Sequence, residues 1–171
     1  NMTNFKNAMD ALYFGSEEDY FQLIDSVKDV NIIEKEWDTK YSLLQIAVAK
    51  GHFEAAKDLI KRGADVNFHN GRNTALIISV FNKRPVEFTR LLIENGADVN
   101  AIDSPHKNNA LWYAIGTLTG KQCKYYDNII ELLKNGADPF NVNKYGSTPA
   151  DWVEEKTSQE LKEIFAPYLN K

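Results

Sequence analysis

The chain has 171 residues, 43% hydrophobic and 26% charged, a composition typical of one soluble globular domain rather than a disordered chain. No apolar run approaches the ~20 residues of a membrane-spanning helix, and the single cysteine, Cys123, excludes a disulfide or a cysteine-based zinc site within one chain. The net charge of −4 argues against nucleic-acid binding, but residues 1–39 carry −6, residues 40–124 carry +5 and residues 125–171 carry −3. The basic middle indicates either solvated outer faces or a surface that meets an acidic partner.

In chain order, the sequence divides into repeated units, which are expected at residues 4–31, 38–67, 70–100, 104–141 and 144–171 of a single domain over residues 1–171. The first four units close on similar motifs that end in an asparagine: Asn31, Asn67, Asn100 and Asn141. These asparagines are 36, 33 and 41 residues apart, a period typical of solenoid repeats.

Each closing motif from the second unit onward follows a helical pattern. Apolar residues at helical spacing predict helices over residues 53–62, 88–93 and 129–133, with shorter helices before them over residues 43–49, 75–81 and 110–115. Gly63, Gly96 and Gly136 follow the longer helices, where a left-handed cap is needed. About six extra residues, around 117–126, are expected to lengthen a helix or form a loop without disrupting the stack. The core pattern on either side of them comes from Leu111, Ala114, Ile129 and Leu133.

The first and last units differ from the others. The first lacks the Gly-Ala-Asp start of the closing motif and is polar, with Asp10, Glu17, Glu18 and Asp19, while the last lacks the closing motif altogether. Because a stacked array needs terminal units with a polar outer face, both are expected to act as caps.

These units resemble the ankyrin-repeat family, whose pattern is a turn with G-x-T-P-L-H-x-A, a second helix and an ending L-L-x-x-G-A-D-V-N. Residues 59–67 read LIKRGADVN, residues 92–100 read LIENGADVN, and the last unit contains GSTPAD at residues 146–151. The resemblance implies an all-α ankyrin-repeat solenoid of about five helix-turn-helix units with short β-turn fingers. The family's histidine after leucine is replaced by Gln45, Ile77 and Trp112, so its usual hydrogen bond is expected to be mostly absent.

No catalytic or metal-binding motif is evident in the sequence. His52 follows Gly51 in the family's structural turn, and His69 and His106 at two adjacent fingertips are fewer than the three or four ligands that zinc sites take. Cys123 has basic neighbours but no histidine close in sequence to act as its base. We therefore expect no enzyme, no metal and no cofactor.

The resemblance implies that a protein partner binds on the concave side, which the fingertips and the exposed face of each first helix line. The fingers are expected at residues 34–41, 68–73, 102–108 and 142–145, and the exposed first-helix face near Tyr13, Ile46, Ile78, Phe81, Tyr113 and Trp152. The alternative for Ile46, Ile78, Trp112 and Trp152 is that they pack between repeats. Because aromatic and arginine side chains dominate interface energetics, the predicted protein-binding residues are Trp37, Tyr41, Phe68, Arg72, Phe81, Lys107, Tyr113 and Tyr145.

We therefore expect a monomeric, cytoplasmic protein-binding module. It would act as an adaptor or as an inhibitor, such as an immunity-type protein that neutralises a toxin or enzyme. The expected partner is an acidic protein, and neither nucleic acid nor a membrane is expected. The alternative is a structural scaffold segment of a larger ankyrin assembly, which the atypical first and last units argue against.

Overall fold

The computed structural model describes residues 2–33, 40–118, 126–156 and 158–170. Within them, extended structure is limited to one isolated antiparallel β-bridge between Ile102 and Asn109, so the predicted all-α class is confirmed. The described residues form these helices: α1 (Met2–Phe14), α2 (Glu17–Leu23), the short 3-10 helix η1 (Ile24–Ser26), α3 (Leu43–Lys50), α4 (Phe53–Lys61), α5 (Ala75–Phe81), α6 (Val86–Glu94), α7 (Ala110–Gly116), α8 (Asp127–Lys134), α9 (Pro149–Glu155) and α10 (Gln159–Leu169).

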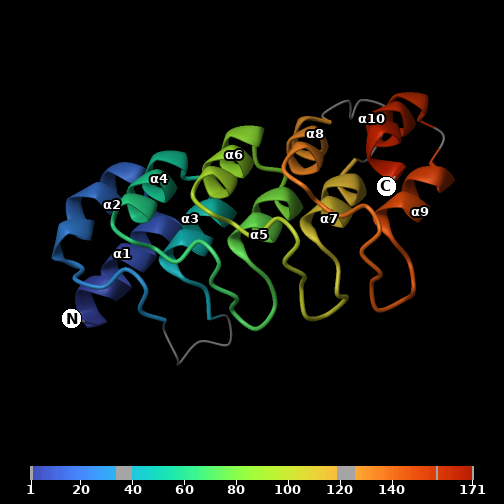
Figure 1. The fold of residues 1–171 in the computed structure, drawn as a ribbon. Helices are drawn as coiled ribbons and strands as arrows, with labels where there is room; N and C mark the ends of the chain where they lie inside the picture. Colours follow the sequence, from blue (N-terminus) through green and yellow to red (C-terminus); the bar gives the residue numbers. More distant parts are fainter. Residues whose placement is uncertain (1, 34–39, 119–125, 157, 171) are drawn as a thin grey trace.

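The helices lie in two rows that run the length of the molecule (Figure 1). One row holds the first helices α1, α3, α5, α7 and α9, each of which contacts the next, and the other holds the second helices. Long loops project from the same side of the first-helix row, where the predicted fingers belong. This arrangement confirms the predicted ankyrin solenoid, whereas the exact unit bounds stay a prediction.

Local sequence signals set where the helices begin and end. Gly63, Gly96 and Gly136 have φ angles of 95°, 92° and 88°, which confirms the predicted left-handed caps after α4, α6 and α8. Four first helices begin at a residue whose side-chain oxygen accepts a hydrogen bond from a first-turn N–H: Ser42, Thr74, Asn109 and Thr148.

The asparagines of the closing motif join each unit to the next. The Nδ2 of Asn67 donates to the carbonyl oxygen of Gly96 at 2.8 Å, and its Oδ1 accepts from the N–H of Asp98 at 2.7 Å. Asn31 makes the same pair of bonds to the second unit, and Asn100 makes it to the fourth. Three asparagines thus provide partners for backbone groups that lie just beyond the second helix of the next unit.

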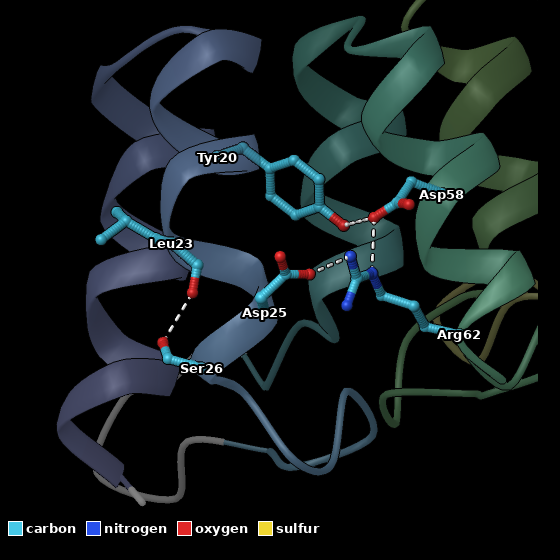
Figure 2. A network of polar contacts seen from close by, with 6 residues as sticks. All are labelled: Tyr20, Leu23, Asp25, Ser26, Asp58 and Arg62. Atoms are coloured by element: carbon cyan, nitrogen blue, oxygen red, sulfur yellow. Dashed lines mark hydrogen bonds and ion pairs between the residues drawn. The ribbon is translucent and has the colours of Figure 1, made fainter.

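A polar network fastens the first unit to the second (Figure 2). The buried Tyr20 of α2 donates its hydroxyl to Asp58 of α4 at 2.8 Å. Arg62 donates to the same Asp58 oxygen at 2.8 Å and to Asp25 of η1 at 2.6 Å. Burial, and secondly the bond to Asp58, raise the pKa of Tyr20 far above its usual value, so its phenol stays a neutral donor.

Two further contacts join the same units. Glu17 lies in the first turn of α2, and its Oε2 accepts from the N–H of Ala55 in the first turn of α4 at 2.7 Å. The ring Nε2 of His52 lies 3.0 Å from the carbonyl oxygen of Leu12 in α1. The predicted structural role of His52 is therefore confirmed.

The fourth unit keeps its core on both sides of the insertion. Leu111, Ala114, Ile129 and Leu133 are at most 4% exposed, as predicted. Residues 119–125, and with them most of the insertion, lie outside the described residues. None of the described helices combines the length and apolar character needed to cross a bilayer.

Candidate protein-binding surface

An asparagine or aspartate closes each of the three fingers that the structure describes fully. The Oδ1 atoms of Asn70, Asp103 and Asn143 accept hydrogen bonds from backbone N–H groups two to five residues further on, at 2.8–3.0 Å. Such side chains compete well for backbone donors in turns. The sequence prediction did not assign these residues a role, although each finger has one near its start.

Neighbouring fingers are also bonded to each other. The N–H of Ser104 donates to the carbonyl oxygen of Arg72 at 2.8 Å, and the N–H of Lys144 donates to that of His106 at 2.9 Å. Because these bonds link equivalent points of consecutive fingers, they hold the fingers in register and give a partner a preformed surface.

The predicted loss of the family's hydrogen bond after leucine is wrong at Gln45. Its Nε2 donates to the carbonyl oxygens of Phe68 and Asn73, both at 3.2 Å, and thereby ties α3 to both ends of the second finger. An amide has two donor hydrogens on one nitrogen, so glutamine can serve both carbonyls.

A hollow of about 410 Å³ lies between the fingers and the first helices, and we call it the concave pocket. The residues that line it are Tyr41, Ala49, Arg72, Asn73, Ile77, Ile78, Phe81, Asn82, Asp103, Pro105, His106 and Tyr113. Four predicted binding residues are among them: Tyr41, Arg72, Phe81 and Tyr113. Residues far apart in the sequence are thus brought to one site.

Two aromatic rings give the concave pocket an apolar wall. Phe81 at the end of α5 is 60% exposed, and its ring meets the half-buried ring of Tyr113 edge to face, with centroids 5.6 Å apart. The hydroxyl of Tyr113 donates to Asp103. Burial, and secondly this bond, raise the pKa of Tyr113 to about 12. Tyr113 is therefore a fixed, neutral support for Phe81.

The exposed charges on the described finger residues are all basic. Lys40, Arg72, Lys107 and Lys144 are exposed, whereas Asp103 is only 4% exposed and bonded to the Tyr113 hydroxyl. Acidic residues of the first finger fall within residues 34–39, outside the described residues. Within the described finger residues, the exposed charge near the concave pocket is therefore positive.

The other predicted binding residues surround this pocket or lie apart from it. Tyr145 is 66% exposed, and its hydroxyl lies 3.1 Å from the Nδ1 of His106, a lining residue. Lys107 is exposed on the same finger as His106, and Phe68 is half-buried and lines a separate, more open hollow. Trp37 lies outside the described residues.

Two residues predicted on the exposed first-helix face are buried. Ile46 is 0% exposed and Ile78 is 3% exposed, because α3 and α5 are each flanked by first helices on both sides. Ile78 is nevertheless among the residues that line the concave pocket. Trp112 and Trp152 are half-buried and pack against each other. The alternative of packing between repeats therefore holds for both isoleucines and in part for the tryptophans.

The histidines take part in backbone contacts. The Nδ1 of His69 accepts from the N–H of Gly71 at 3.1 Å, and its Nε2 lies 3.2 Å from the carbonyl oxygen of Ile102. Over the described residues, no group of three or more histidine, cysteine, aspartate or glutamate side chains is placed to hold a metal ion. Cys123 lies outside them.

Comparison with protein families agrees with this geometry. The family model described as ankyrin repeats (3 copies) matches residues 8–103 and 44–143. The chain belongs to the ankyrin-repeat family. Ankyrin repeats are general protein–protein interaction modules, typically without catalytic activity.

Individual relatives are much longer than this chain. Human ankyrin repeat and SOCS box protein 6 is 34% identical over 112 residues, which cover 64% of this chain and 26% of the relative. Human transient receptor potential cation channel subfamily A member 1 is 26% identical over 157 residues, 90% of this chain and 13% of the channel. A putative ankyrin repeat protein of fowlpox virus, FPV031, is 30% identical over 115 residues, 63% of this chain and 30% of the relative.

Proposed function

We propose that this protein binds a protein partner through the concave pocket, acting as an adaptor or an inhibitor, and that it has no catalytic activity of its own. The observation that carries the proposal is Phe81, a large apolar side chain 60% exposed at the mouth of a preformed hollow. Water contact with such a ring is unfavourable, and burying it against a partner recovers that free energy. Aromatic anchors in pockets commonly dominate protein interfaces.

The partner segment is expected to combine an apolar side chain with acidic neighbours. Arg72 lines the concave pocket and Lys107 lies on the next finger, and both are exposed. Acidic groups on the partner would be drawn to this rim during approach, which raises the association rate more than the final affinity. Arg72 can also hold a carboxylate through two parallel hydrogen bonds.

We also propose that the protein is a monomer and acts in the cytoplasm. Apolar side chains are also exposed outside the concave pocket, such as Phe14 at 82% exposure, and such surface can drive self-association, so the monomeric state needs a test. Sedimentation at micromolar concentration should give a single species with the mass of one chain. A stable dimer would contradict this part of the proposal.

Differential capture tests the binding site. Wild-type protein and the variants Phe81→Ala and Phe14→Ala are immobilised, and the proteins that each retains from an extract of the producing cells are quantified. Both phenylalanines are exposed, so both variants should fold, and only Phe81 lines the concave pocket. A partner retained by wild type and Phe14→Ala should be lost with Phe81→Ala.

Affinity measurements with the purified partner complete the test. Phe81→Ala should weaken binding by at least ~2 kcal/mol, roughly thirtyfold. Arg72→Ala should mainly slow association and reduce its dependence on salt. If Phe81→Ala binds like wild type while Lys57→Ala, on the second helix α4, fails to bind, the site is on the opposite face.

The alternative is a scaffold segment of a larger ankyrin assembly. It is favoured by the fact that the chain matches less than a third of the length of each relative described above. A scaffold segment needs no target in its own concave pocket. Loss of a specific partner with Phe81→Ala therefore separates the two functions.

A further inference from the structure

Another hollow, of about 220 Å³, lies one unit beyond the concave pocket, between α7 and α9. It is lined by Trp112, Ser147, Asp151, Trp152 and Glu155, and we call it the tryptophan cradle. The two indole rings have centroids 4.5 Å apart and are tilted by 40°, so they form one angled aromatic wall. Two carboxylates stand beside this wall.

The backbone around the cradle holds the rings in place. A Cβ atom on Gly116 of α7 would lie 2.7 Å from the Cη2 of Trp152, so the absence of a side chain there lets the indole rest on α7. Thr148 and Asp151 form reciprocal hydrogen bonds of 2.9 and 3.0 Å that fix the start of α9. The aromatic wall is therefore preformed.

The electrostatics of the cradle favour a cation. The face of an indole ring is electron-rich and attracts ammonium groups. Within the molecule, the Nζ of Lys156 already lies 5.3 Å from the centroid of the Trp152 ring, although Lys156 is not among the residues that line the cradle. Glu155 is exposed and has no ion pair with any described residue, which leaves its charge available to a ligand.

The two indole rings of the cradle offer no lone-pair acceptor to an N–H donor. One Asp151 oxygen already accepts from the N–H of Thr148. A primary ammonium has three N–H donors and is strongly hydrated, so it would lose more hydration than the cradle replaces. A methylated ammonium has the same charge but fewer N–H donors, or none, and it fits aromatic walls well.

We propose that the tryptophan cradle binds the methylated ammonium head of a lysine side chain on a protein partner. Trp112 of the cradle and Tyr113 of the concave pocket are consecutive residues of α7, so one partner chain can reach both hollows. The exposed charge is basic at Arg72 and acidic at Glu155. A partner segment with an acidic part and a methylated lysine would therefore bind in one direction only.

Titration of the whole chain with a small probe tests the cradle independently of the concave pocket. The probe is Nα-acetyl-Nε-trimethyl-lysine methylamide, and the readout is the indole N–H signals of Trp112 and Trp152 in NMR spectra. Both signals should shift and saturate together. The uncharged isostere, with a tert-butyl carbon in place of the nitrogen, should bind about five- to thirtyfold more weakly, the range expected for a cation over aromatic faces.

A matched pair of variants tests the charge. Glu155→Gln should weaken probe binding about two- to fivefold, the usual range for an exposed charge pair. Glu154→Gln makes the same charge change on the same helix at a residue that does not line the cradle, and it should leave binding unchanged. Both positions are exposed, so both variants should fold.

The cradle proposal is overturned if the probe shifts neither indole signal, if the isostere binds equally well, or if the two glutamate variants behave alike. Choline binding more tightly than the lysine derivative would also overturn it, because the site would then serve a free small cation. None of these outcomes affects the proposed function, which depends on Phe81 in the other hollow.

Discussion

Replacing Asn67 with alanine tests whether the closing asparagines hold the repeats together. The substitution removes two hydrogen bonds to the next unit, to Gly96 at 2.8 Å and from Asp98 at 2.7 Å. A hydrogen bond within a protein stabilises it by about 0.5–1.5 kcal/mol net. All three residues are exposed, so water can partly replace the lost bonds. We therefore expect the free energy of unfolding to fall by about 1–2 kcal/mol.

Urea unfolding followed by circular dichroism measures this loss, and thermal unfolding should show a fall in Tm of roughly 2–8 °C for a domain of this size. Asn95→Ala is the matched control. Asn95 is also exposed, but its Nδ2 donates to the carbonyl oxygen of Leu91 within its own helix, at 2.8 Å. If Asn67→Ala costs no more than Asn95→Ala, the bridges between units do not stabilise the array.

Three further predictions concern individual contacts. Glu17→Ala should cost about 1 kcal/mol in urea unfolding, because a first-turn amide of α4 loses its acceptor at 2.7 Å, whereas Glu18→Ala should have little effect. The pKa of Tyr113 is raised to about 12 from 10.0, so the folded state holds the phenol proton more tightly than the unfolded state does. The protonated phenol therefore contributes its full stabilisation below pH ~10, and this contribution is lost as the pH rises towards ~12. Tyr113→Phe should flatten that alkaline decline, measured by unfolding between pH ~9 and ~12; an unchanged decline would contradict the assignment. Gly116→Ala should lower the Tm and change tryptophan emission, because the new methyl group would lie 2.7 Å from the Trp152 ring. This crowding costs about 1–3 kcal/mol, more than the ~1 kcal/mol that alanine gains in helix propensity. A raised Tm would show that the ring moves freely.

The sequence predicted what depends on local pattern. The helices, the left-handed glycines and the finger positions each follow from residues within one unit, and the repetition of the pattern fixes their phase. Phe81 was predicted on the exposed first-helix face from the family resemblance, and it is exposed. Such features need no knowledge of how one unit sits against the next.

The sequence did not predict what depends on two units together. The bridges of Asn67 and the contact of Glu17 with α4 join residues 29 to 38 positions apart. The burial of Ile46 arises because helices on both sides cover α3. The pairing of Trp112 with Trp152 likewise depends on the stacking of α7 on α9. The residue pattern within one repeat does not say how closely the next repeat packs against it, and each of these features depends on that packing.

The concave pocket itself is shared by three units, the first of which contributes Tyr41 and Ala49, and this links binding to stacking. Arg72 and Phe81 come from one unit, and Asp103 and Tyr113 from the next. Their relative positions therefore depend on the contact between α5 and α7 and on the bond between neighbouring fingers. In a linear array, each interface between units contributes its own share of stability. A partner that bridges this interface would bind the stacked form alone, so at 100 times its Kd it should stabilise the stack by about 2.7 kcal/mol.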